Sequence, residues 1–128
     1  MSEPIWVPFT VILAIHDRQI ARHGGAPGLR NRALLEMGCA RAMNLAVHTD
    51  SGLAEIAAAY AFGISKAHAF VDGNKRTAFV TALTFLRLNG YSFRPQTIEG
   101  VRMMENLASG EVSEADFTRW LATGMSAI

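Results

Sequence analysis

The segment HAFVDGNKRT, residues 68–77, places a histidine, a carboxylate and two adjacent cations close together in a chain that is half apolar. His68 is a candidate general base, because imidazole titrates near neutral pH. Asp72 is a candidate ligand for Mg²⁺, which favours one or two carboxylates together with phosphate oxygens. Lys75 and Arg76 are suited to binding the phosphate itself, Lys as a point charge and Arg as a bidentate fork. Together these residue types predict chemistry on a phosphate group.

A helix predicted to begin at or just after Asn74 explains how these groups would meet. The first N–H groups of a helix lack internal partners and carry partial positive charge, so they form a ready anion site. Gly73 permits a tight turn and a close approach to a ligand. Lys75 and Arg76 oppose the helix dipole at this place by about 0.3–1 kcal/mol each. Two cations at a helix start therefore favour a bound anion.

Each of these residues, taken singly, also has a structural interpretation. A histidine at a helix end is most often structural, and Asp-Gly-Asn is usually a turn.

Lys66, two residues before His68, is a further candidate for binding the same anion. GNKRT is not a P-loop, because that motif requires G-x-x-x-x-G-K-[ST] after a strand. The combination favours a phosphate site over a solvated loop between two helices.

The apolar residues around this segment recur at helical spacing between glycine-containing breaks. The pattern predicts an all-α fold, a compact bundle of about six helices around a buried central helix. Helices are expected at about residues 9–20, 31–45, 53–68, 74–88 and 97–108, and after residue 113. The 74–88 helix is apolar nearly all round, which is typical of a helix at the centre of a bundle.

Local signals mark the ends of some of these elements. Asp50 or Ser51 is expected to cap the third helix, and Ser113 with Asp116 forms an S-x-x-D cap for the last. Residues 91–95, YSFRP, form at most one short extended piece, such as one side of a hairpin turn.

Three residues outside the polar cluster have a predicted place. Phe70 is expected to insert into the core and anchor the loop. His16, followed by Asp17, invites comparison with metal-binding HD phosphohydrolases, but that site requires a further histidine upstream and His16 is the first in the chain. A buried histidine satisfied by a partner is the alternative. Cys39 has no adjacent histidine, which favours buried packing over a nucleophilic role.

Length and composition limit the classes of function. The 128 residues fit one domain, 1–128. With 12 basic and 11 acidic residues the formal charge is +1, so there is no strong attraction to nucleic acid or to an anionic membrane. The apolar run 6–15 is shorter than the roughly 20 residues that span a bilayer and lacks the flanks of a signal peptide. One cysteine permits no internal disulfide, which favours a reducing cytoplasm.

The segment HAFVDGNKRTA closely resembles the H-x-F-x-D-x-N-K-R-T core of the Fic/Doc superfamily, in its Doc (death-on-curing) branch. Residues 14–30, AIHDRQIARHGGAPGLR, also resemble the first part of Doc proteins, as do LTFLRLNGY and LASGEVSEADFTRWL further along. The similarity therefore spans nearly the whole chain. Doc-like proteins are small all-α toxins of toxin–antitoxin modules, and the recurrence of His16 in their pattern suggests a structural role or one near the loop.

The resemblance implies ATP and Mg²⁺ as cofactors and assigns roles to the cluster. His68 matches the base that activates an acceptor hydroxyl, and Asp72 matches the residue that holds Mg²⁺ on the ATP phosphates. The anion-binding part of the motif corresponds to Gly73, Asn74, Lys75 and Arg76.

Two departures from the AMP-transferring motif H-P-F-x-[DE]-G-N-G-R bear on the reaction. Ala69 replaces the proline, and Lys75 replaces the second glycine, where it fills room beside the backbone and adds charge. Doc proteins with this lysine resemble kinases that transfer the γ-phosphate of ATP to a threonine of elongation factor Tu, which halts translation. AMP transfer remains an alternative, because Gly73 is more Fic-like than an alanine there.

The resemblance also implies a partner, a small Phd-like antitoxin whose disordered C-terminal segment folds into a groove on the toxin. SGEVSE does not match the self-inhibitory S-x-x-x-E-[GN] pattern of some Fic proteins, so control is expected from outside the chain. A further alternative is a non-enzymatic module that binds RNA or the ribosome through the arginines of the first third. A solvated basic face is the simpler interpretation, and neither nucleic acid nor a membrane is expected as a partner.

Overall fold

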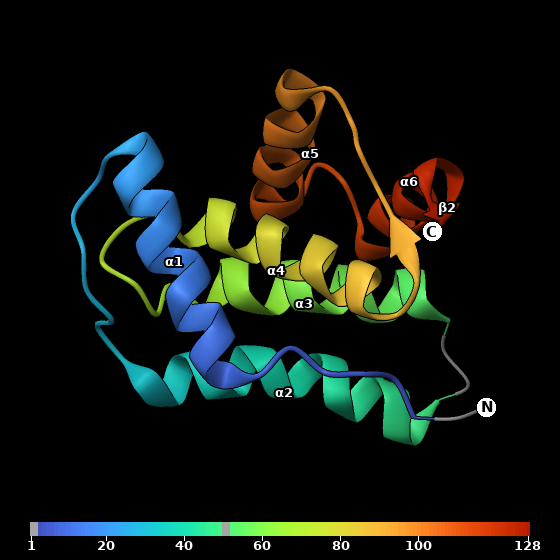
Figure 1. The fold of residues 1–128 in the computed structure, drawn as a ribbon, viewed down its shortest axis with the longest axis horizontal. Helices are drawn as coiled ribbons and strands as arrows, with labels where there is room; N and C mark the ends of the chain where they lie inside the picture. Colours follow the sequence, from blue (N-terminus) through green and yellow to red (C-terminus); the bar gives the residue numbers. More distant parts are fainter. Residues whose placement is uncertain (1–2, 50–51) are drawn as a thin grey trace.

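A computed structural model of the protein describes residues 3–49 and 52–128 (Figure 1). Over these residues the chain forms six helices and one two-stranded antiparallel sheet. The elements are α1 (Phe9–His23), α2 (Arg32–His48), α3 (Leu53–Ala67), α4 (Asn74–Leu88), β1 (Tyr91–Ser92), α5 (Thr97–Ser109), α6 (Glu114–Gly124) and β2 (Ser126–Ala127). The predicted all-α bundle of about six helices is confirmed. None of the described helices is both long enough and apolar enough to cross a membrane.

The centre of the bundle is α3, not the 74–88 helix that we expected there. α3 packs against α2, α4, α5 and α6, and its residues from Ile56 to Ala61 are all buried. α4 packs against α1, α3 and α5, but it exposes the side chains of Lys75, Arg76 and Arg87. The separation of packed helices depends on the side chains at their contact. The alanine-rich α3 therefore admits neighbours on all sides, whereas the larger side chains of α4 are buried only on one face.

The approach of α2 to α3 is closest at a pair of glycines. A Cβ built on Gly38 would lie 2.7 Å from the carbonyl oxygen of Gly63, and a Cβ on Gly63 would overlap the carbonyl oxygen of Gly38. Both glycines are buried inside helices. They are required because the two backbones touch at this crossing.

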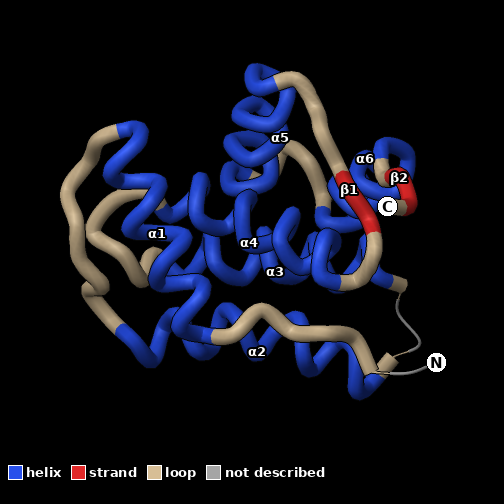
Figure 2. The backbone as a smooth tube through the Cα atoms, in the orientation of Figure 1, coloured by secondary structure: helices blue, strands red, loops and turns tan. Residues whose placement is uncertain are grey.

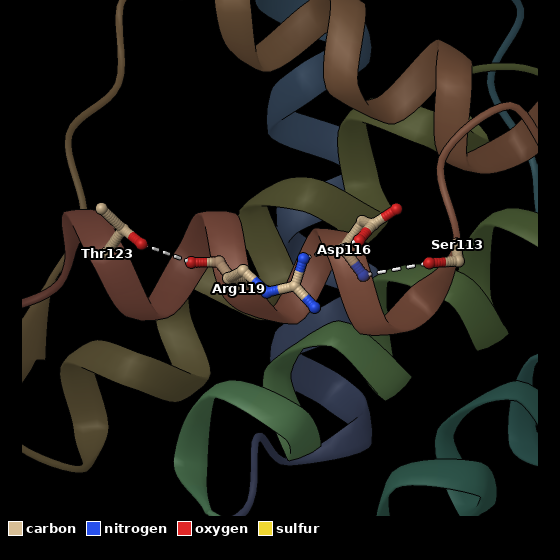
Figure 3. Close-up of polar contacts among 4 residues, drawn as sticks. All are labelled: Ser113, Asp116, Arg119 and Thr123. Carbon is tan, nitrogen blue, oxygen red and sulfur yellow. Dashed lines mark hydrogen bonds and ion pairs between the residues drawn. The ribbon is translucent and has the colours of Figure 1, made fainter.

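The predicted cap of α6 is present (Figure 3). The Ser113 hydroxyl accepts a hydrogen bond from the Asp116 N–H at 3.0 Å. The Asp116 carboxylate pairs with Arg119 at 2.9 Å, and the Thr123 hydroxyl donates to the Arg119 carbonyl at 2.8 Å. The caps predicted for α3, Asp50 and Ser51, lie outside the described residues.

The turn after α4 anchors both ends of the described chain. The Asn89 side chain donates to the Ile5 carbonyl at 2.9 Å and accepts from the Ile5 N–H at 2.8 Å. The Ile128 N–H donates to the Gly90 carbonyl at 2.9 Å. The predicted extended piece is β1, but its partner β2 comes from the far end of the chain and not from a local hairpin (Figure 2).

At the opposite end of α4, the segment joining α1 to α2 lies beside the segment joining α3 to α4 (Figure 1). The Val71 N–H donates to the Gly28 carbonyl at 3.1 Å, and the N–H groups of Arg30 and Asn31 donate to the Ala69 carbonyl at 2.7 and 3.0 Å. These bonds make residues 24–31 a second wall of the loop that carries the candidate site. The glycine-rich break in the sequence is thus part of the site's framework.

Candidate functional site

His68 ends α3 in a left-handed conformation, with φ 49° and ψ 40°. Among the described residues it is the only non-glycine with a positive φ. Such a residue costs on the order of 1–3 kcal/mol and persists where the surroundings hold it. Here the Arg30 guanidinium donates to the His68 carbonyl at 2.7 Å. The imidazole is left exposed at the rim of the loop, where it is free to accept a proton from a substrate.

The Asp72 carboxylate is fixed by backbone donors from both segments. One oxygen accepts the Gly73 N–H at 3.1 Å, and the other accepts the Ala26 N–H at 3.3 Å. Gly25, with φ 115°, passes so close that a Cβ on it would lie 3.0 Å from Asp72 Oδ2. The carboxylate is therefore held in one orientation, although its oxygens keep further lone pairs for a cation.

The donor set fits Mg²⁺ bound with phosphate better than Mg²⁺ bound by protein alone. Over residues 3–49 and 52–128 no group of three or more His, Cys, Asp or Glu side chains is placed to hold a metal ion. Mg²⁺ commonly takes one or two carboxylates and completes its shell with phosphate oxygens and water. Asp72 would hold it in this way.

The first turn of α4 is the candidate anion cradle. Gly73 precedes it with φ 76°, and the Thr77 N–H returns to the Gly73 carbonyl at 3.0 Å. In the described part of the chain the N–H groups of Asn74, Lys75 and Arg76 have no acceptor. The side chains of Lys75 and Arg76 are exposed, and no described carboxylate is within ion-pair distance of them. Open backbone donors and two cations without ion pairs among the described residues thus occupy the same helix start, where an anion is favoured.

Asn74 takes part in the site differently from the prediction. Its amide oxygen accepts the Phe70 N–H at 3.0 Å, and its amide nitrogen donates to the Phe70 carbonyl at 3.0 Å. The side chain is therefore engaged in holding the loop, and only its backbone N–H is open to an anion. Phe70 itself is 2% exposed, which confirms that it anchors the loop in the core.

Lys66 is not brought to the loop. Its ammonium donates to the Ala108 carbonyl at 2.8 Å, at the end of α5, and lies 5.8 Å from the centre of the Phe62 ring. The Lys66 ammonium is therefore engaged at the end of α5, whereas His68 lies past the end of α3 in the loop. The four residues that the structure does gather around the loop, in addition to the backbone cradle, are His68, Asp72, Lys75 and Arg76.

The family model described as the Fic/DOC family matches residues 6–86. This stretch contains α1, α2, α3, the whole loop and nearly all of α4. The chain belongs to the Fic/DOC family. "Protein kinase doc" of Escherichia phage P1 is 35% identical over 103 residues, which cover 80% of this chain and 81% of that protein. "Toxin Doc" of Mycolicibacterium smegmatis is 41% identical over 69 residues, or 52% of this chain and 53% of that protein. These relatives place the chain in the Doc branch.

Sequence reasoning missed the contact of one residue beside the loop. The arginines of the first third, Arg30 among them, were assigned to a solvated basic face, whereas the Arg30 guanidinium donates to the His68 carbonyl. His16 was expected to be a buried histidine satisfied by a partner, with a structural role or one near the loop; it is 2% exposed and its Nε2 lies 2.7 Å from the Asp72 carbonyl oxygen, which agrees with that expectation. The signals were a glycine-rich turn ending in Leu-Arg and a polar residue on the apolar face of the first helix. Neither signal identifies the residue that the side chain contacts in the folded protein.

The Fic/DOC chain also has a groove between α2 and α3, with a volume of about 720 Å³. Its apolar lining includes Leu34, Met37 and Phe62. Arg41 stands over the Phe62 ring at 4.7 Å and pairs with Glu114 of α6. The groove extends to Ala67, the residue before His68, and much of its lining is apolar, so it is a candidate for binding a protein segment.

Cys39 is expected to react slowly. Burial, and to a smaller extent the charge of Glu36, raises the pKa of its thiol from 9.0 to about 11. The thiolate is the reactive form, so at pH 8 the rate of labelling should be roughly a hundredfold below that of a thiol with its ordinary pKa. Labelling with a chromogenic disulfide, in native buffer and after unfolding in urea, measures this difference. Equal rates in the two conditions would contradict the packing role.

Proposed function

We propose that this Fic/DOC protein is a toxin that transfers the γ-phosphate of ATP to a hydroxyl of a translation factor such as elongation factor Tu. The observation that carries the proposal is the start of α4, where open N–H groups and the unpaired Lys75 and Arg76 adjoin a fixed carboxylate. The relative from phage P1 supports it, since that protein is named a protein kinase. A target in translation places the proposed activity in the cytoplasm.

The proposed reaction assigns one task to each group. The acceptor hydroxyl gives its proton to His68 as its oxygen bonds to the γ-phosphorus, and the bond from that phosphorus to the bridging oxygen breaks, so that ADP leaves. Asp72 would hold Mg²⁺, which neutralises charge on the phosphate oxygens. Lys75, Arg76 and the N–H groups of α4 stabilise the remaining negative charge. Phosphoryl transfer depends mainly on positioning and charge stabilisation, and these residues provide both.

Lys75 favours phosphate transfer over AMP transfer. Its side chain occupies the first turn of α4, where the AMP-transferring motif has a glycine, and it is free of ion pairs with the described residues. A cation there adds charge and bulk beside the first N–H groups. AMP transfer is the second candidate, favoured by Gly73, which stands where that motif has its first glycine.

The experiment that separates the two reactions uses the purified protein with Mg²⁺, ATP and elongation factor Tu. The target is then weighed by intact mass spectrometry. A gain of one phosphate supports the kinase proposal. A gain of one AMP shows that the second candidate is correct. An unchanged mass overturns elongation factor Tu as the target.

We further propose that a Phd-like antitoxin segment occupies the groove between α2 and α3. Met37 lines this groove and is 69% exposed, so Met37→Glu should leave the fold intact while placing a charge in an apolar contact. Loss of such an anchor typically costs 2 kcal/mol or more of binding, about thirtyfold in affinity. Titration calorimetry of each purified protein with a Phd-like antitoxin measures the effect.

The matched control for this prediction is Ile98→Glu on α5, where the side chain is similarly exposed at 64% and lies outside the groove. We expect the Ile98→Glu variant to bind the antitoxin with unchanged affinity. If both variants bind as the wild type does, the groove is not the site of the antitoxin.

A further inference from the structure

His16 makes a contact beneath the loop that the proposed reaction does not use. Its Nε2 lies 2.7 Å from the carbonyl oxygen of Asp72. Its ring stacks on the Phe70 ring, with centroids 3.8 Å apart and planes 10° from parallel. Because a carbonyl oxygen only accepts, Nε2 must carry the proton of this bond. The ring is therefore a fixed donor directed at the backbone of the loop.

We propose that His16 is a positioning residue of the candidate site. By donating to the Asp72 carbonyl it fixes the peptide between Asp72 and Gly73. That peptide joins the carboxylate that would hold Mg²⁺ to the helix start that would hold phosphate. The effect on nucleotide binding rests on the proposed function, whereas the effect on the loop does not.

The Asp72–Gly73 peptide requires such a contact because glycine leaves it free to rotate. Gly73 adopts φ 76°, and a Cβ on it would lie 3.6 Å from the Cδ2 and Nε2 atoms of His16 and 3.1 Å from the Cδ1 of Ile20. The positive φ and the close approach to Ile20 call for glycine at this position, and the hydrogen bond from His16 restricts the freedom that glycine brings.

The position of the His16 ring is itself determined by its surroundings. Phe70, on which it stacks, is held at both backbone groups by Asn74. The His16 Nδ1 lies 3.9 Å from the carboxylate of Asp17, which is 83% exposed. Both the neutral tautomer and the imidazolium can donate through Nε2, so the positioning does not depend on the charge of the ring.

Two substitutions separate the donor from the ring. His16→Gln keeps an N–H donor of similar reach but loses the stacking surface, and His16→Phe keeps an aromatic ring but leaves the Asp72 carbonyl unpaired. Ile12→Val, one turn earlier in α1 and 1% exposed, is the control for a general loss of packing. If His16→Phe does not fold, His16→Asn replaces it, because its amide is one methylene shorter and falls short of the carbonyl.

Amide hydrogen exchange, followed by NMR, tests the effect on the loop. In His16→Phe the amides of Phe70, Val71 and Thr77 should exchange about tenfold faster or more, because a buried carbonyl loses its donor. The Phe117 amide in α6 should not change. His16→Gln should restore protection, and Ile12→Val should not affect these amides selectively. Unchanged protection in His16→Phe, or an equal change throughout the protein, would overturn the proposal.

The binding of ATP with Mg²⁺, measured by calorimetry, tests the consequence for the site. We expect His16→Phe to weaken binding about tenfold and His16→Gln to restore it. Equal affinity of wild type and His16→Phe would overturn the positioning role. If the wild type does not bind ATP, the proposed function fails, while the exchange experiment still decides whether His16 holds the loop.

Discussion

Replacing His68 with alanine is expected to lower the rate of target phosphorylation by roughly 10²–10⁴-fold, the usual contribution of a general base. The substitution should change the free energy of unfolding by no more than about 1 kcal/mol, because surface changes usually have small effects. The imidazole is exposed, and the bond from Arg30 reaches the backbone carbonyl, which alanine retains. Initial rates from intact mass spectrometry and a urea unfolding curve measure the two quantities.

His48→Ala is the matched control for this substitution. His48 is exposed at the last turn of α2 and lies outside the loop, so its loss should leave the rate unchanged. An undiminished rate in His68→Ala would contradict the assignment of the base. A similar loss in both variants would show that the effect does not come from the candidate site.

Replacing Gly63 with alanine is expected to destabilise the fold by about 3 kcal/mol, the upper end of the range for overpacked cores. Alanine normally stabilises a helix relative to glycine by about 1 kcal/mol. Here the added methyl group would overlap the Gly38 carbonyl oxygen, and backbone atoms of two helices cannot give way as a side chain does. Circular dichroism during urea unfolding measures the loss.

Gly52→Ala is the control for the effect of alanine on the same helix. Gly52 precedes α3 with φ –77°, and nothing lies within 4 Å of a Cβ built on it. Its replacement should change stability by less than about 1 kcal/mol. If the Gly63→Ala protein has the same free energy of unfolding as the wild type, α2 and α3 can move apart without loss of stability, and the prediction is wrong.

The parts of the fold that were predictable from the sequence are those with local causes. The start of α4 after Gly73 and the cap of α6 at Ser113 follow from helix-end chemistry, which involves only neighbouring residues. Phe70 was recognisable as an anchor because it is an apolar residue in a polar loop. The resemblance to the Fic/Doc motif drew attention to the same segment. The match to the family model confirms the resemblance.

The parts that were not predictable depend on residues far apart in the sequence. The bonds from Ala26 and Arg30 cross about 40 positions to reach the loop, and no local pattern specifies such a pairing. The central place of α3 was missed because hydrophobicity was taken as the measure of burial, whereas the small size of alanine decides how many helices can surround another. The contact of Lys66 with the Ala108 carbonyl was missed because its partner lies 42 positions away in the sequence.

The attachment of Ile5 and Ile128 to the Asn89–Gly90 turn has a practical consequence for handling the protein. That turn follows α4, and the candidate site precedes it, so the fifteen residues of the helix separate them by roughly 22 Å at 1.5 Å per residue. An affinity tag, fluorophore or surface tether joined at either end would emerge on the side of the molecule facing away from the loop. Immobilised or labelled forms should therefore keep the cradle open to nucleotide and to a protein substrate.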